Sequence, residues 1–170
     1  SVILWGDSHA AHLYEGFKDN LEKKGYSVGL LSSSGCSPIM GIDVTERPYC
    51  KRFNEIALPA ILKIKPKILI LSAIWFADRH TMDMLEKTIQ RLTKEKIQIV
   101  ILGISPIYKA NVPLLIANFL VMKTPIEQTK DMLDVDFLAK TDKIMLKRFG
   151  ARNDIQYISI MESFCSDYIC

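Results

Sequence analysis

Apolar residues occur along the chain in two kinds of pattern, short continuous runs and stretches with helical spacing. Continuous runs are typical of buried strands, and apolar residues three or four apart are typical of helices with one buried face. The runs predict five strands, over residues 2–5, 27–31, 68–72, 98–102 and 156–160. The helical spacing predicts helices over residues 10–24, 51–65, 81–95 and 131–149, with Gly25 and Gly150 ending the first and the last.

Strands that alternate with amphipathic helices indicate a parallel sheet covered by helices on both faces. We therefore predict an α/β fold, a three-layer α/β/α sandwich around a parallel, flavodoxin-like sheet of about five strands. Ligands bind such sheets beyond the carboxyl ends of the strands. Ser8 and the segments 32–38, 73–80 and 105–112 follow the first four strands, so we expect them to meet at one rim of the sheet.

Length and composition favour one globular domain over residues 1–170. With 49% hydrophobic residues, the chain can bury a substantial core. Its 22 basic and 19 acidic residues give a net charge of +3 and form no basic stripe, so no nucleic-acid partner is expected. No apolar run approaches the roughly 20 residues of a membrane-spanning helix. Because the chain begins directly on a strand, we expect it to be a fragment of a larger protein.

The four cysteines occur as two local pairs, Cys36 with Cys50 and Cys165 with Cys170. Four cysteines allow three pairings, of which two local disulfides are the simplest. Disulfides favour an oxidising compartment, whereas four reduced thiols would be typical of the cytosol. Zinc is disfavoured because no Cys-x-x-Cys spacing or neighbouring His supports it, and the first turn lacks the Gly-rich loop of a nucleotide site. We expect no metal and no cofactor.

The first predicted strand is followed by Gly6, Asp7 and Ser8, after which a helix is expected. In one interpretation, Asp7 or Ser8 caps that helix, since both side chains accept hydrogen bonds from free amides. In the other, Ser8 is a nucleophile at a helix N-terminus, where backbone N–H groups and the helix dipole stabilise an oxyanion. The two interpretations are compatible, because Asp7 can cap while Ser8 points into a cleft. Gly6 permits the tight bend.

Six short motifs follow one another over nearly the whole chain. They read GDSHAAHL, SSSGCSPI, CKRFN, ILILSAIWF, IVILGISPIY and SFCSDYIC. The first motif resembles block I of the SGNH/GDSL hydrolase superfamily. Together with both cysteine pairs in order, the full pattern resembles the SGNH domain fused to acyltransferase-3 membrane proteins of bacteria.

This resemblance implies a serine O-acyltransferase or acetylesterase, in which Ser8 is acylated and then deacylated, with Gly6, Asp7 and His9 supporting it in the same motif. A membrane-embedded acyltransferase-3 domain of the same parent chain would supply an acyl group, by expectation acetyl. The acceptor would be a cell-surface glycan such as lipopolysaccharide O-antigen or peptidoglycan. The domain would be periplasmic or extracytoplasmic and tethered to the membrane. The alternative is a non-catalytic SGNH-like domain that binds a glycan or a partner.

The sequence departs from the family pattern at the general base. SGNH enzymes carry their catalytic Asp and His in an Asp-x-x-His motif, and none occurs up to Cys170. A serine hydroxyl needs a base within hydrogen-bonding distance to be a useful nucleophile. Three histidines are candidates. His9 should leave the turn in another direction, His12 would have to fold back over the first turn, and His80 follows the third strand. We expect the Asp-x-x-His motif to lie beyond Cys170 or to have been lost.

The oxyanion hole is the second departure. The resemblance implies the Ser8 amide and a block II glycine as donors. Gly35 is the candidate for this glycine and Gly41 the reserve, although either can be a plain turn glycine. The family's third donor is an asparagine, but residues 72–75 read Ser-Ala-Ile-Trp. The hole would then consist of backbone amides or lack one donor.

Three aromatic residues near the rim are candidates for contacts with a sugar. Trp75 and Phe76 could line an acceptor groove, since an aromatic face suits the apolar face of a sugar ring. The alternative for both is core packing at the end of a buried strand. Tyr108, beyond the fourth strand, allows the same two interpretations.

Overall fold

The computed structural model of the protein describes residues 1–109, 111–122 and 133–165. Within these residues the strands are β1 (Val2–Gly6), β2 (Val28–Ser32), β3 (Ile68–Ser72), β4 (Gln98–Leu102) and β5 (Gln156–Ile158). The helices are α1 (Ser8–Glu22), α2 (Tyr49–Ile64), α3 (Arg79–Thr93), α4 (Val112–Met122), α5 (Val135–Phe149) and α6 (Ile160–Phe164).

The strands form one parallel sheet in the order β2-β1-β3-β4-β5. In this order, β1 lies between β2 and β3, so Gly6 is paired with Ser32 on one side and with Ser72 on the other. From β1 the chain continues to β2, on one side of β1, and then crosses to β3 on the other side of β1. Such a reversal of direction is where ligand crevices form in open parallel sheets. The predicted parallel sheet of about five strands is confirmed.

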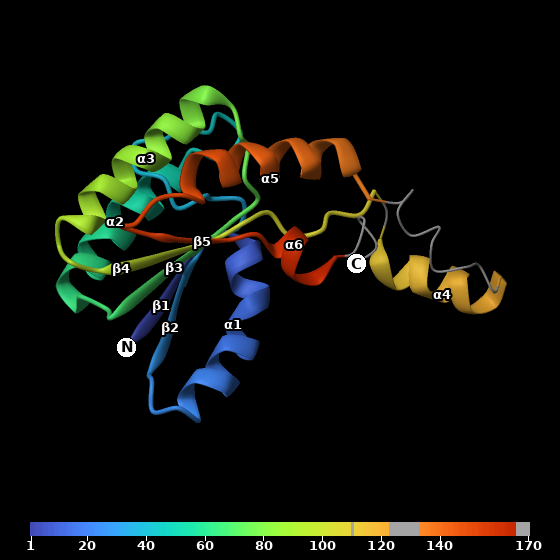
Figure 1. The fold of residues 1–170 in the computed structure, drawn as a ribbon, viewed down its shortest axis with the longest axis horizontal. Helices are drawn as coiled ribbons and strands as arrows, with labels where there is room; N and C mark the ends of the chain where they lie inside the picture. The colour runs from blue at the N-terminus through green and yellow to red at the C-terminus, as the bar shows by residue number, and fades with distance from the viewer. Residues whose placement is uncertain (110, 123–132, 166–170) are drawn as a thin grey trace.

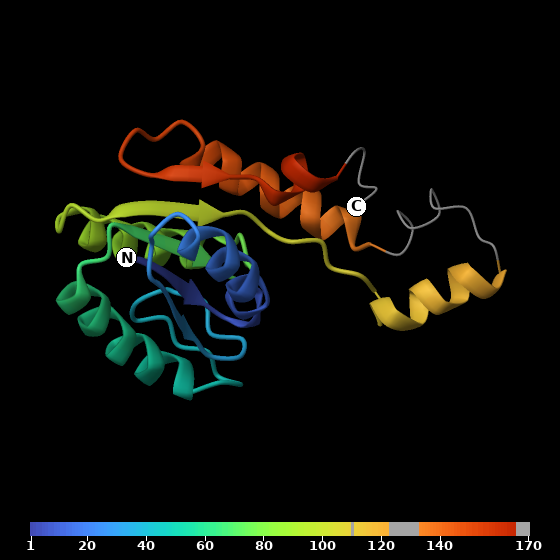
Figure 2. The same ribbon diagram turned by 90° about the horizontal axis from the view of Figure 1, so that it is seen from below.

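Side chains of β1 point alternately into two apolar cores, one on each face of the sheet. Ile3 and Trp5 pack with apolar residues of α2, α3 and α5. Val2 and Leu4 pack on the opposite face with apolar residues of α1. Figures 1 and 2 show the same division, with α1 below the sheet in Figure 1 and the other three helices above it. The predicted three-layer α/β/α sandwich is therefore confirmed.

The helices α1, α2 and α3 each begin two residues earlier than predicted. The first turns of α1 and α3 are capped, α1 by Asp7, which accepts from the His9 N–H, and α3 by Asp78, which accepts from the Thr81 N–H at 3.0 Å. Hydrophobic spacing marks only the turns that are buried, whereas a cap marks where the helix begins. The apolar pattern alone therefore placed these starts too late.

Two helices were not predicted, α4 and α6. The strand predicted over residues 156–160 ends at Ile158, because Ser159 accepts a hydrogen bond from the Glu162 N–H at 3.0 Å and begins α6. The helix predicted over residues 131–149 begins at Val135, since Leu133 forms a bridge with Tyr108 and Asp134 is the capping residue. The first two positions of the prediction, 131 and 132, lie outside the described residues.

A disulfide joins Cys36, in the segment after β2, to Cys50 in the first turn of α2, as predicted. Both cysteines are fully buried and are 14 positions apart. Closing a loop of this size stabilises a fold by about 3 kcal/mol through the entropy of the unfolded chain. Cys165 is also disulfide-bonded, and its predicted partner Cys170 lies outside the described residues.

Candidate functional site

Asp7 joins the turn between β1 and α1 to the segment that follows β3. Its side chain is fully buried. The carboxylate Oδ1 accepts from the His9 N–H at 2.8 Å, and Oδ2 accepts from the Ile74 N–H at 3.0 Å. The first bond caps α1, as one interpretation of the sequence proposed. The second bond fixes the start of α1 against the end of β3, 67 residues further along the chain.

Gly6 is paired with Ser72 of β3 and leaves no room for a side chain between the two strands. A Cβ atom built on Gly6 would be 1.7 Å from the carbonyl oxygen of Ser72. The φ angle of Gly6 is not in the positive range, so the backbone conformation does not require a glycine here. The glycine is required because β3 lies so close. Ser72 itself is buried, and its Oγ has no hydrogen-bond partner among residues 1–109, 111–122 and 133–165.

Ser8 is the first residue of α1 and is exposed. Within the described residues, neither its hydroxyl nor its backbone N–H has a hydrogen-bond partner. The N–H groups of His9, Ala10 and Ala11 donate to Asp7. The Ser8 hydroxyl is therefore accessible to a ligand and lies beside one unsatisfied N–H, that of Ser8 itself, at the positive end of the helix dipole.

In the structure, none of the three histidines forms a hydrogen bond with the Ser8 hydroxyl. The Nδ1 atom of His12 lies 3.3 Å from the carbonyl oxygen of Ser8, so its ring contacts the backbone. Burial lowers the pKa of His9, the charge of His12 lowers it further, and the charge of Asp7 opposes both. The Nδ1 atom of His9 is buried and has no hydrogen-bond partner in the part of the chain that the structure describes. His80 is exposed in the first turn of α3.

Gly35 lies in the segment after β2 with φ +65°, a conformation that favours glycine. A Cβ atom at this position would be 2.6 Å from Nε of Arg47, so the guanidinium group covers the glycine. The Ser33 N–H donates to the Gly6 carbonyl at 3.2 Å, which attaches the segment to the end of β1. The N–H of Gly35 has no acceptor among the described residues.

The rest of this segment is held from α2 and α3. The side-chain amide of Asn54, in α2, donates to the carbonyl oxygens of Ser37 at 2.9 Å and Ile39 at 3.0 Å. Gly41 also has a positive φ, +72°, and a Cβ atom there would be 3.1 Å from Cε of Met84 in α3. Gly41 therefore packs against α3, whereas Gly35 lies two residues after Ser33, whose N–H donates to the Gly6 carbonyl at the end of β1.

The aromatic candidates occupy different environments. Trp75 is fully buried, and its Nε1 donates to the Leu102 carbonyl at 2.8 Å, so it belongs to the core. The interpretation of Trp75 as part of a groove was wrong, because its indole faces the interior. The next residue, Phe76, is 51% exposed. Tyr108 is partly buried and forms an isolated antiparallel bridge with Leu133.

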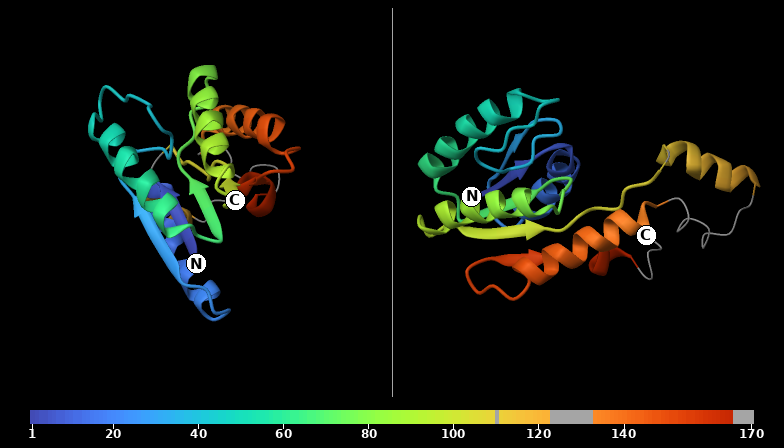
Figure 3. Two further views of the ribbon diagram at one scale, coloured as in Figure 1. Left: turned by 90° about the vertical axis from the view of Figure 1, so that its left-hand side faces the viewer. Right: turned by 90° about the horizontal axis from the view of Figure 1, so that it is seen from above.

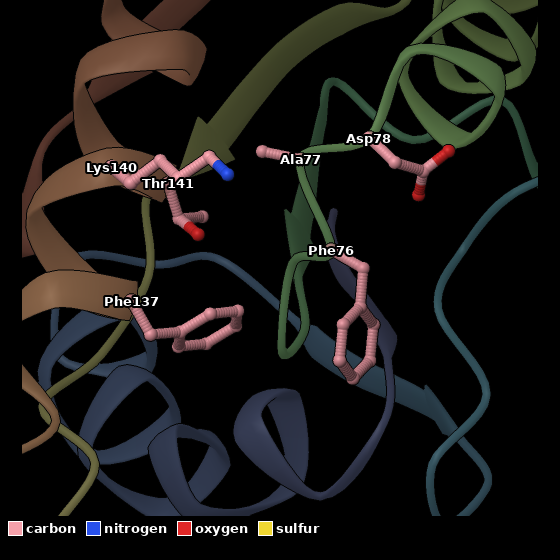
Figure 4. A pocket seen from close by; sticks show the side chains of 6 residues that line it. All are labelled: Phe76, Ala77, Asp78, Phe137, Lys140 and Thr141. Atoms are coloured by element: carbon pink, nitrogen blue, oxygen red, sulfur yellow. The ribbon is translucent and has the colours of Figure 1, made fainter.

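Two cavities share Phe76 and Asp78 as walls. One, of about 260 Å³, lies between the segment after β3 and helix α5, and Figure 4 shows its side chains. It is lined by Phe76, Ala77, Asp78, Phe137, Lys140 and Thr141. The other, of about 360 Å³, is lined by Gly35, Ser37, residues 42–47, Phe76, Asp78 and Thr81. The rings of Phe76 and Phe137 are 6.0 Å apart between centroids.

Sequence reasoning missed Arg47, Phe137 and Lys140. Phe137 and Lys140 lie three residues apart on α5, on the side of that helix that faces the cavity. A partly exposed aromatic residue and a lysine in a helical pattern carry no signal that distinguishes them from ordinary surface positions. In the part of the chain that the structure describes, no group of three or more His, Cys, Asp or Glu side chains could hold a metal ion.

The parallel sheet, with a serine at the start of α1 beyond the end of β1, defines an SGNH-type α/β domain. The chain belongs to the family described as "SGNH domain (fused to AT3 domains)", which it matches over residues 1–170. The resemblance inferred from the sequence motifs is confirmed. No match was found among curated proteins.

Two solved structures share the fold. The periplasmic domain of a lipopolysaccharide acetyltransferase from Salmonella ser. Paratyphi A gives a TM-score of 0.82 at 21% identity, covering 99% of this chain and 69% of that chain. A GDSL-like lipase from Bacteroides thetaiotaomicron gives a TM-score of 0.58 at 12% identity, covering 99% of this chain and 72% of that chain. At these identities the likeness establishes the SGNH fold.

Proposed function

We propose that this domain transfers acyl groups, by expectation acetyl, to or from cell-surface glycans through an acyl-Ser8 intermediate. The observation that carries the proposal is the exposed Ser8 hydroxyl, which has no partner among the described residues and stands at the N-terminus of α1. Membership of the SGNH family supports acyl chemistry at this position. The structural similarity to the periplasmic domain of a lipopolysaccharide acetyltransferase supports a glycan acceptor such as lipopolysaccharide or peptidoglycan.

In the proposed reaction, Ser8 Oγ attacks the carbonyl carbon of the acyl donor and forms a tetrahedral oxyanion. The proton of the hydroxyl passes to a base, a role that the family assigns to its Asp-x-x-His pair. As the oxyanion collapses, the donor's leaving group departs with a proton and acyl-Ser8 remains. A sugar hydroxyl then attacks the ester and regenerates Ser8. If water attacks instead, the same intermediate is hydrolysed.

The oxyanion would be bound by the backbone N–H groups of Ser8 and Gly35. Both amides lack an acceptor within the described residues. The Gly35 segment is held by the Cys36–Cys50 disulfide and by the hydrogen bond from the Ser33 N–H, so its donor is positioned before the substrate binds. Donors fixed in advance need no reorganisation during the reaction, and losing one costs roughly 3 kcal/mol in comparable sites.

The two cavities beside Phe76 are the proposed acceptor site. The exposed face of Phe76 can stack on the apolar face of a sugar ring. Charged side chains on both sides of it, Asp78 and Lys140 among them, offer hydrogen bonds to hydroxyl groups. The cavity volumes, about 260 and 360 Å³, are near the lower end of the range that small ligands occupy, roughly 300–1,000 Å³.

The proposed setting is extracytoplasmic. The Cys36–Cys50 disulfide supports an oxidising compartment, and the family description supports fusion to an acyltransferase-3 domain. We propose that residues 1–170 form one domain, tethered to the membrane through that partner domain. Among the described residues, no helix has both the length and the apolarity needed to cross a bilayer.

Fluorophosphonate labelling read by intact mass tests the nucleophile. Labelling is measured with and without added imidazole, which can replace an absent histidine base. We expect one label on the wild type in at least one of the two conditions, and none on Ser8→Ala. Ser27→Ala, at another exposed serine, is the matched control and should label as the wild type does. If the wild type stays unlabelled in both conditions, Ser8 is not a nucleophile.

The second candidate is glycan binding without catalysis. It is favoured by the absence, within the described residues, of any histidine bonded to the Ser8 hydroxyl. Isothermal titration with lipopolysaccharide-derived oligosaccharides tests glycan binding, and fluorophosphonate labelling then distinguishes the two functions. A domain that only binds would lose affinity in Phe76→Ala, would keep it in Ser8→Ala, and would take no fluorophosphonate label.

A further inference from the structure

Helix α4 exposes apolar side chains in all directions. Its eleven residues include no charged residue. Six of its side chains are exposed by 39–80%: Val112, Leu114, Ile116, Leu120, Val121 and Met122. Successive residues of a helix are about 100° apart, so these six positions surround the axis with no wide gap between them. A surface helix of a globular protein normally has one polar face. The described side chains of α4 are all apolar, and its one polar residue, Asn118, is not among them.

The fold does not cover this helix. None of the described side chains of α4 belongs to either apolar core of the sheet. In Figures 1 and 2 and in the right-hand view of Figure 3, α4 stands away from the sheet and its covering helices. Contiguous apolar surface of this kind marks a site of interaction with a protein or a membrane.

The distribution of apolar residues distinguishes between possible partners. A helix bound in a protein groove keeps a polar face toward water, and a second copy of this chain would cover one side of α4. Lipid can surround all sides. At 1.5 Å per residue, α4 is about 16 Å long, roughly half of the 30 Å hydrocarbon core of a bilayer. The helix therefore matches the depth of one leaflet.

Charge near the helix is compatible with a lipid surface. Lys109 is exposed and precedes the first residue of α4 by three positions. The chain as a whole carries a net charge of +3. Basic residues beside an apolar insertion are attracted to anionic headgroups.

We propose that α4 inserts into one leaflet of a lipid bilayer and anchors the domain to the membrane surface. This inference goes beyond acyl transfer, because it requires neither Ser8 nor the cavities beside Phe76. A failure of vesicle binding and a failure of Ser8 labelling are therefore separate results.

Flotation of the 170-residue protein with phosphatidylcholine vesicles that contain a minority of phosphatidylglycerol tests the proposal. We expect the wild type to float with the vesicles. The double variant Leu120→Asp/Val121→Asp should bind at least ~100-fold more weakly, because carboxylates replace two apolar side chains that would be buried in lipid. Both positions are more than 75% exposed, so thermal unfolding of the variant should match the wild type.

The matched control is the double variant Ile56→Asp/Ile64→Asp, at two exposed isoleucines of α2. It should float as the wild type does. Insertion depth is read from Leu120→Trp in vesicles with brominated acyl chains, because both native tryptophans are fully buried. Strong quenching of the new tryptophan supports insertion. The proposal is overturned by wild type that stays with the soluble fraction, or by self-association in solution that Leu120→Asp/Val121→Asp abolishes.

Discussion

The substitution Asp7→Asn distinguishes a simple helix cap from the two-bond bridge seen in the structure. Asn and Asp are about equally good at N-cap positions. If Asp7 only capped α1, the free energy of unfolding would change by no more than about 0.5 kcal/mol. In the structure, Oδ1 serves the His9 N–H and Oδ2 serves the Ile74 N–H. Asparagine has one oxygen, so it can keep only one of these bonds.

The expected loss follows from the second bond. In Asp7→Asn, either the His9 or the Ile74 N–H faces an amide NH₂, which is also a donor. A hydrogen bond to a charged group contributes roughly 1.5–3 kcal/mol, and we expect a loss of about 2–3 kcal/mol. Asp7→Ala removes both bonds and should lose about 3–4 kcal/mol, since an N-cap adds about 1 kcal/mol.

Urea unfolding monitored by far-UV circular dichroism measures these differences. The control is Asp78→Asn, at the N-cap of α3, where the side chain accepts from the Thr81 N–H. This control should remain within about 0.5 kcal/mol of the wild type. An Asp7→Asn protein that is as stable as Asp78→Asn would refute the role of the Ile74 bond.

Two further predictions concern Gly6 and His9. Gly6→Ala should destabilise the fold by more than about 4 kcal/mol, because its Cβ would be 1.7 Å from the Ser72 carbonyl oxygen. Gly16→Ala in α1, with no atom within 4 Å of the new Cβ, should instead add about 0.5–1 kcal/mol in the same urea assay. Burial lowers the pKa of His9, so the unfolded chain binds that proton more readily and stability should fall as pH drops below about 6.5. His9→Gln should reduce this decline in urea unfolding measured across that pH range, and an unchanged decline would assign it to other groups.

The sequence by itself determined the layers of the fold. Burial of apolar surface is the main stabilising contribution, so each strand and each packed helix must show its buried face in the spacing of its residues. The runs at residues 68–72 and 98–102 were found as β3 and β4 with those bounds. The local pair Cys36 and Cys50 was also correct, since two cysteines that flank one short segment are close in any compact fold. The motif GDSHAAHL, together with the other five motifs and both cysteine pairs in order, identified the family.

Only the tertiary structure decided which side chains surround the site. Trp75 and Phe76 are neighbours in sequence and both are aromatic, yet one is fully buried and the other half exposed. The second hydrogen bond of Asp7 joins positions 67 residues apart. Arg47, near the end of the segment between β2 and α2, covers Gly35 near the start of that segment. These contacts depend on the order and register of the strands, which place distant segments side by side. Periodicity records whether a residue is buried, but it carries no information about which residue lies opposite.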